Sequence, residues 1–246
     1  MARHGSRRAG RWPVQLRFAT QDITGEEYVS SRLWEHARLS CCPLHAQGGC
    51  GFASHGTYVR VSPPGTRIRR WYCPRAGVTF SALPDCLCAR LSGTLPDLER
   101  VVRLAEAAPS LEKAVRTERC EIELPGVLRF FRRRVVRTHR ALSAIKGLYP
   151  DTFAGVVATV NAFALVLGDG SHAGLPTPNT AMANTDSVLV RLRDLASRHL
   201  AMLPAPLGLN PVRIKAQQMD LARQHRVGPD RPIVLVEIAG CPGQSP

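Results

Sequence analysis

Four cysteine and histidine residues in the first third of the chain have a spacing that suits a metal ion. Cys42 and His45 stand three positions apart, Cys50 follows soon after, and Cys73 comes at the end of the stretch RIRRWYC. Thiolates and imidazoles are the ligands that Zn²⁺ prefers, and two ligands two to four residues apart, followed by a hairpin and a further ligand, are typical of structural zinc sites. The spacing therefore predicts that one Zn²⁺ is bound by Cys42, His45, Cys50 and Cys73.

The second half of this predicted site is irregular. A zinc ribbon normally has C-x2-C at this point, whereas this chain reads Cys73-Pro-Arg-Ala76. The fourth ligand must then come from elsewhere, and Cys50, His55 or Cys41 can supply it. The alternative is that the cysteines are ordinary buried thiols without a metal, which is the interpretation we favour for Cys86, Cys88, Cys120 and Cys241.

Short strands are expected to position the ligands. The stretches 56–62 (GTYVRVS) and 67–73 (RIRRWYC) alternate in the manner of strands, and a Pro-Pro-Gly turn separates them. A module of about forty residues is too small to build a sufficient apolar core, so a bound metal would take the place of that core. Before the hairpin we expect a basic arm over 3–11, a strand over 14–18 and an amphipathic helix over 28–39.

The second chemically distinctive feature is an arginine-rich segment, predicted to be a helix from Leu124 to Ile145. Its apolar residues fall on one face and its arginines on the other, and no acidic residue occurs between Glu123 and Asp151. A helix about 11 Å wide fits a major groove about 12 Å wide. The apolar face comprises Leu124, Leu128, Phe131, Val135 and Leu142, and the opposite face comprises Arg129, Arg133, Arg137 and Arg140, with Arg132 and Arg134 beside them.

This segregation predicts contact with double-stranded DNA. The amino-terminal part of a recognition helix usually faces the bases, so we expect Arg129, Arg132 and Arg133 to read bases. Arg137 and Arg140 would then bind phosphates. The alternative is a charged face that is merely solvated, but self-repulsion among these arginines without a polyanion would be costly.

Three predicted helices have the order and lengths of a helix-turn-helix: 95–108, 110–117 and the arginine-rich helix. The expected fold class is α+β and mostly helical. It comprises an N-terminal arm and helix (1–40), a zinc-ribbon-like hairpin module (41–82), a helix-turn-helix (83–146) and a helical C-terminal region with a flexible tail (147–246). In that last region we expect helices over 152–167 and 188–203 and a strand over 233–238.

Composition agrees with a nucleic-acid partner. The 246 residues carry a formal net charge of +14, and only Lys113, Lys146 and Lys215 among the basic residues are not arginine. Arginine binds phosphate through two parallel hydrogen bonds, although a genome rich in G and C would also favour arginine codons. The absence of a signal-like apolar segment predicts a cytoplasmic, nucleoid-associated protein. The uncharged run 152–168 contains Asn161 and is short for a membrane span, so we interpret it as a buried helix.

The segment 41–142 resembles the start of transposase-related proteins of bacterial insertion elements. The resemblance rests on three stretches: His55-Gly-Thr-Tyr-x-Arg, Arg70-Trp-Tyr-Cys-Pro and Thr79-Phe-Ser-Ala-Leu-Pro. It implies a zinc ribbon followed by a helix-turn-helix, which together bind transposon-end DNA. Ala76 departs from the pattern, because a second-knuckle cysteine is expected at that position.

The sequence predicts no catalytic activity. Full transposases of this kind have a downstream domain with spaced carboxylates that hold two metal ions, and the strand-rich frame for such carboxylates is not evident after the arginine-rich helix. We therefore expect an accessory protein or regulator, with a transposase or a second copy of the chain as possible further partners. The alternatives are a compact metal-dependent transposase or nuclease and a protein that binds RNA or an acidic partner. The candidate carboxylates of the first alternative are Asp151, Asp169, Asp186, Asp194, Asp220, Asp230 and Glu237.

Overall fold

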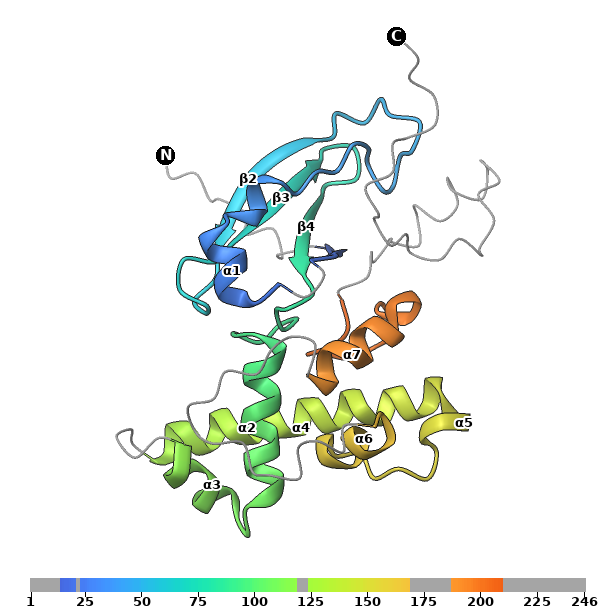
Figure 1. Ribbon diagram of the computed structural model, residues 1–246. Helices are drawn as coiled ribbons and strands as arrows, with labels where there is room; N and C mark the ends of the chain where they lie inside the picture. Colours follow the sequence, from blue (N-terminus) through green and yellow to red (C-terminus); the bar gives the residue numbers. More distant parts are fainter. Residues whose placement is uncertain (1–13, 21–22, 119–123, 169–186, 210–246) are drawn as a thin grey trace, which may run out of the picture.

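A four-stranded sheet forms the first half of the molecule. The computed structural model describes residues 14–20, 23–118, 124–168 and 187–209, and the predicted basic arm and the 233–238 strand lie outside them. The strand order is β1-β4-β3-β2; β1 runs parallel to β4, and the other neighbours are antiparallel (Figure 1). The strands are β1 (Val14–Phe18), β2 (Ala53–Val59), β3 (Arg67–Cys73) and β4 (Val78–Pro84).

Strands β2 and β3 form an antiparallel hairpin within a larger sheet. Strand β3 has the predicted bounds, whereas β2 lies three residues before the predicted stretch 56–62. On one face of the sheet Trp71 pairs with Phe80 and Cys73 pairs with Val78, and all four residues are buried. Val14 of β1 packs on this face as well. Ile68 and Leu83 are buried in a separate cluster. The strand predicted over 14–18 is confirmed as β1, and it pairs with β4 in this sheet.

The helix expected over 28–39 is shorter than predicted. Helix α1 spans Gly25–Ser30 and begins at a capping box in which Thr24 and Glu27 satisfy each other's backbone N–H groups. Arg32 then adopts a left-handed conformation with φ of 50°, which ends the helix, and a 3₁₀ turn, η1, follows over Leu33–Glu35.

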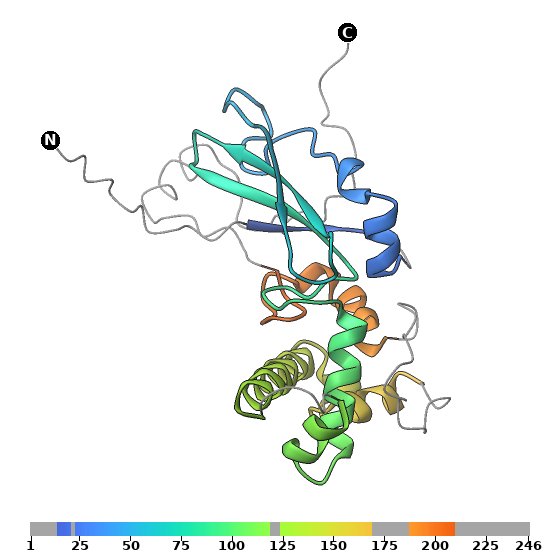
Figure 2. The same ribbon diagram turned by 90° about the vertical axis from the view of Figure 1, so that its left-hand side faces the viewer.

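The second half of the molecule is helical, so the fold is α+β as expected. Figure 1 places these helices below the sheet with α7 nearest to it, and Figure 2 shows α4 nearly end-on beside the upright α2. None of the described helices has the length and apolar character that a membrane span requires. The elements are α2 (Leu95–Ala107), α3 (Leu111–Glu118), α4 (Leu124–Leu148), α5 (Pro150–Phe153), α6 (Val160–Val166), α7 (Val188–Leu195) and the 3₁₀ turn η3 (Ser197–His199).

Helices α2, α3 and α4 occur where the sequence predicts them. Val101 of α2, Val115 of α3 and Phe131 of α4 share one buried cluster. A second, larger cluster joins α2 and α4 to α5, α6 and α7. Helices α2 and α3 thus both pack on α4, and their interpretation as a helix-turn-helix stays a prediction.

Two buried carboxylates of α2 cap the helices that follow. Glu99 accepts hydrogen bonds from Ser187 Oγ at 2.7 Å and from the Leu189 N–H at 3.0 Å, at the start of α7. Glu106 accepts from the N–H groups of Val160 and Asn161 at 2.8 and 3.1 Å, at the start of α6. Carboxylates stabilise the amino-terminal ends of helices, because free N–H groups and the positive dipole end lie there.

These caps help to explain why the predicted helices 152–167 and 188–203 were too long. The first is split into α5 and α6, because α6 begins anew at Thr159, whose side chain accepts from the Ala162 N–H. The second ends at Leu195, and η3 follows. The apolar pattern indicated burial only in part: Phe153, Val160 and Phe163 are buried, whereas Val157, Leu165 and Val166 are exposed. Nor could it show where a carboxylate of α2 would start a new helix.

Arg193 of α7 connects the helical half to the segment that follows β4 through hydrogen bonds. Its side chain is 2 % exposed and donates to four backbone carbonyls, those of Asp85, Leu87, Pro206 and Leu207, at 2.7–3.2 Å. The first two carbonyls belong to the connection between β4 and α2. A single guanidinium therefore satisfies buried carbonyls from two separate segments.

We expect Arg193→Met to destabilise the protein by about 3 kcal/mol, because it leaves several buried carbonyls without donors. Thermal unfolding should then occur roughly 6–12 °C lower. The matched control is Arg198→Met, which removes an exposed guanidinium from η3. Equal unfolding temperatures for the two variants would show that the Arg193 hydrogen bonds contribute nothing.

Candidate functional site

The four predicted metal ligands lie together at one end of the sheet. Cys42, His45 and Cys50 come from the loop between η1 and β2, and Cys73 is the last residue of β3. Their potential ligand atoms all lie within 4.8 Å of one another. His45 Nδ1 is 3.4 Å from Cys42 Sγ and 3.5 Å from Cys73 Sγ.

The loop makes this convergence possible through tight turns. The His45 N–H donates to the Cys42 carbonyl at 3.1 Å, so both side chains leave the same turn. Gly51, next to Cys50, has a φ of 69°, and a Cβ there would lie 2.9 Å from Pro74 Cγ. Glycine is required at that position, because it adopts positive φ freely and leaves room for Pro74.

The ligand group is largely buried, and burial opposes ionisation of the Cys42 thiol. Cys42 and Cys73 are 2 % and 0 % exposed. Burial, with the neighbouring Cys73 thiol, raises the pKa of Cys42 to about 12. Burial and the charge of Arg75 lower the pKa of His45, which keeps its imidazole neutral and able to donate a lone pair. A bound cation would offset the cost of ionising adjacent thiols, so the four residues can hold a metal ion.

Of the alternative ligands, neither joins this group. His55 lies on β2 with its ring 5.6 Å from the ring of Tyr72. Cys41 precedes Cys42 but is not one of the four clustered residues, and Cys86 and Cys88 are buried elsewhere. Within the described part of the chain, the Cys42–His45–Cys50–Cys73 group is the one cluster of potential metal ligands, and it contains no carboxylate.

The arginines of α4 divide into exposed and buried members. Arg129, Arg132, Arg133 and Arg140 are exposed, and Arg137 is half-buried. Arg134 faces inward: it is 7 % exposed, donates to the Ser92 carbonyl at 3.0 Å and stacks on the Phe130 ring at 4.0 Å. The buried face of α4 is formed by Val127, Phe131, Arg134, Thr138, Ala141, Leu142 and Ile145.

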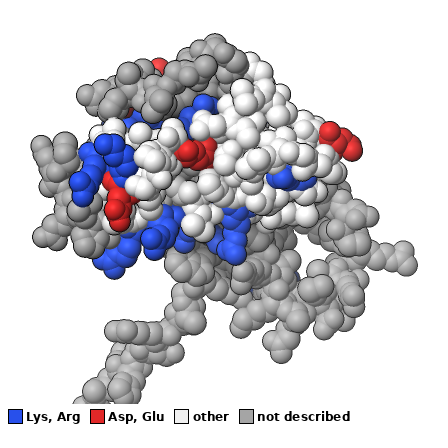
Figure 3. Space-filling model, turned by 90° about the horizontal axis from the view of Figure 1, so that it is seen from below, with Lys and Arg blue, Asp and Glu red and all other residues white. Residues whose placement is uncertain are grey.

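The exposed arginines give the helical half a strongly basic edge. Figure 3 shows Lys and Arg side chains gathered along the lower edge of the helical side, with few acidic side chains among them. Helix α4 itself has no acidic residue over its whole length. Leu128 and Val135, which we expected on the packing face, are half-buried, so the face is rotated slightly from the predicted one.

The described acidic residues that could serve a nuclease are engaged elsewhere or exposed. Asp194 pairs with Arg17 at 2.7 Å, and the same arginine binds Asp85 at 2.7 Å. Asp151 is exposed near the start of α5. Asp169, Asp186, Asp220, Asp230 and Glu237 lie outside the described residues.

Comparison with known protein families, with characterised proteins and with solved structures finds no match to this chain. The resemblance to transposase-related proteins stays a prediction.

Proposed function

We propose that this protein binds double-stranded DNA through the exposed face of α4 and that Zn²⁺ stabilises its sheet module. The observation that carries the proposal is the set of exposed arginines on one helix that has no carboxylate of its own. Like charges on a helix face repel, and a polyanion relieves this repulsion. The four arginines are Arg129, Arg132, Arg133 and Arg140.

The ligand set supports zinc rather than a harder metal. Three thiolates and one imidazole match the tetrahedral Cys₃His sites of Zn²⁺, whereas Mg²⁺ and Ca²⁺ prefer oxygen. Four protein ligands leave no open position for a substrate. The role that follows for the metal is structural: it replaces apolar core at the end of the sheet, where Cys42, Cys50 and Cys73 pack with Phe80.

A helix face of this kind suits a duplex better than a single strand. Single-strand binders present aromatic rings for base stacking. On α4 the aromatic residues are Phe131, which is buried, and Phe130, whose exposed ring stacks on the Arg134 guanidinium, so α4 presents one aromatic ring rather than a row of them. We therefore favour a nucleoid-associated DNA-binding protein, related to transposases as an accessory protein or regulator without strand-transfer chemistry.

The test is binding of the full chain to a duplex of about 20 base pairs, measured by fluorescence anisotropy between about 50 and 200 mM salt. We expect a logarithmic affinity that falls linearly with log salt, with a slope of about −4 or steeper, because each phosphate contact contributes about −0.9. Single-stranded DNA, duplex RNA and polyglutamate serve as competitors. Equal competition by all of them, or no binding at the lowest salt, would rule out the proposal.

A further inference from the structure

Arg90 lies beside the arginine face of α4, although it is far from α4 in the sequence. It belongs to the connection between β4 and α2, and its side chain is exposed. Its backbone is left-handed, with φ of 57°, a conformation that is costly for a residue other than glycine. Arg137 Nη1 donates to the Arg90 carbonyl at 3.3 Å, which places Arg90 against α4.

Other arginines hold this strained turn on both sides. Arg60 donates to the carbonyls of Cys88, at 3.0 Å, and of Leu91. Arg134 donates to the Ser92 carbonyl at 3.0 Å and to Ser92 Oγ at 3.2 Å. The carbonyls on either side of Arg90 are therefore fixed, and the exposed Arg90 side chain extends from a rigid base.

Three arginines consequently lie close together, and the Arg137 guanidinium contacts the Arg90 backbone. Arg133 and Arg137 are one helical turn apart on α4, and Arg90 approaches Arg137 from the connection. Partial burial, followed by the positive charges of Arg133 and Arg90, lowers the pKa of Arg137, with no acidic group contributing. Like charges held this close are unfavourable until an anion neutralises them.

We propose that Arg90, Arg133 and Arg137 form a preformed site for one phosphate group, and that a phosphodiester of the DNA backbone is its ligand. This assigns Arg133, which we expected to read a base, to the DNA backbone instead. Guanidinium groups bind phosphate oxygens through paired, charge-assisted hydrogen bonds, and an arginine triad surrounds a phosphate from several directions. The inference deepens the proposed function and rests on it. It adds to the interface a residue from outside α4 that sets the position of the duplex backbone along the helix.

Two glycine substitutions test the site with matched charge and backbone. Arg90→Gly removes one guanidinium and relieves the left-handed strain, so the fold is preserved. Arg32→Gly is the control: Arg32 is exposed, has φ of 50° and carries the same charge, but it lies after α1 in the sheet module. Affinity for the duplex is measured as a function of salt concentration for both variants. Arg133→Gln is a third variant, which removes another guanidinium of the proposed site.

We expect Arg90→Gly and Arg133→Gln each to reduce the steepness of the salt slope by about one unit, and Arg32→Gly to leave it unchanged. If the wild type binds DNA and Arg90→Gly matches Arg32→Gly, the triad is not a phosphate site, whereas the DNA-binding proposal stands.

A second measurement separates the two sources of phosphate. The unfolding temperature is compared in inorganic phosphate and in chloride at equal ionic strength. Suppose that the wild type does not bind DNA but is stabilised by phosphate, and that Arg90→Gly loses this stabilisation. The anion site would then stand, but DNA would not be its ligand. If the wild type neither binds DNA nor is stabilised specifically by phosphate, both proposals are wrong.

Discussion

Removal of the metal from the Cys42, His45, Cys50 and Cys73 group is expected to lower the thermal unfolding temperature by at least about 10 °C. Structural zinc sites contribute about 10–16 kcal/mol of apparent binding free energy in small domains. If about 5 kcal/mol of this is realised here, the shift is roughly 10–20 °C for a chain of this size. Protein purified without chelator should contain about one zinc per chain, and the measurement is thermal unfolding with and without a strong chelator.

Two cysteine substitutions separate metal binding from ordinary packing. Cys73 and Cys86 are both fully buried, but only Cys73 belongs to the ligand group. Cys73→Ser should abolish zinc binding and make unfolding insensitive to chelator. Cys86→Ser should retain one zinc and the full response to chelator. A well-folded wild type that contains no zinc and ignores chelator would contradict the metal assignment.

The loss of metal should unfold the sheet more than the helices. The apolar cluster around Phe80 includes three of the ligands, so it loses its shape together with the metal. The helical half has a separate buried cluster that includes Leu98, Leu142 and Phe163. Cys42→Ser should therefore keep most of the helical circular dichroism signal while the sheet becomes susceptible to proteolysis, as expected for a module whose core depends on the ion.

Local sequence signals predicted where the strands and helices lie better than which of them pair or pack together. The alternation in 67–73 and the capped, amphipathic pattern of 95–107 indicate β3 and α2 within a few residues. The ligand spacing identified the four residues that converge, because a tight turn holds Cys42 near His45 and a strand end supplies Cys73. Strand alternation, helix capping and ligand spacing are all set by residues that lie close together in the sequence.

What the sequence could not show depends on long-range packing. The parallel pairing of β1 with β4 joins segments about sixty residues apart, and no local pattern indicates it. The helical periodicity placed Arg134 beside the basic face, yet Arg134 is buried and donates to the Ser92 carbonyl. Arg90 lacks any motif, and only its approach to Arg137 places it near the arginine face.

The largest effect on binding is expected from removal of the exposed arginines of α4. Replacing Arg129, Arg132, Arg133 and Arg140 by glutamine should weaken duplex binding on the order of 100-fold and reduce the steepness of the salt slope by about two to four units. Glutamine keeps helix propensity, and none of the four side chains is buried, so stability should change little.

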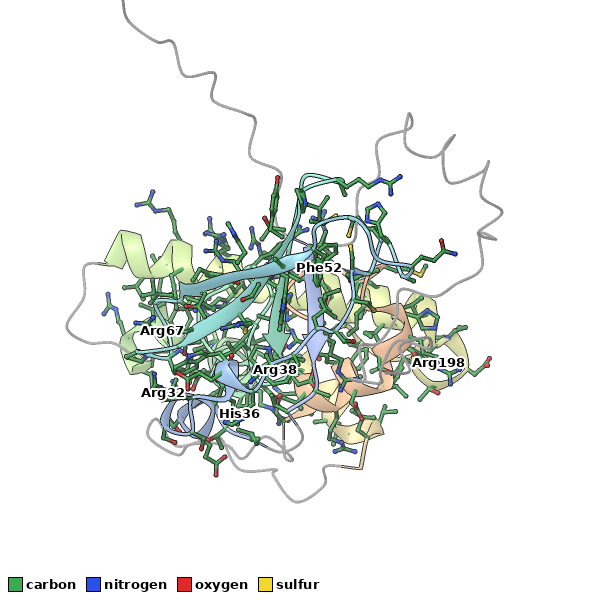
Figure 4. All side chains as sticks on the ribbon, turned by 90° about the horizontal axis from the view of Figure 1, so that it is seen from above. Arg32, His36, Arg38, Phe52, Arg67 and Arg198 are labelled. Atoms are coloured by element: carbon green, nitrogen blue, oxygen red, sulfur yellow. The ribbon has the colours of Figure 1, made fainter. Side chains whose placement is uncertain are left out.

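The control variant changes the net charge equally on other surfaces. Arg32, Arg38, Arg67 and Arg198, which are labelled in Figure 4, are exposed and belong to parts of the chain other than α4. If binding depends only on net charge, the two quadruple variants will lose affinity equally. If α4 is the interface, the control variant will show nearly the same dependence of log affinity on log salt as the wild type. The reason is that counterions are released only where an arginine contacts a phosphate of the duplex. A control variant that loses more affinity than the α4 variant would transfer the interface to the sheet side, where Arg67 and its neighbours would become the contacts.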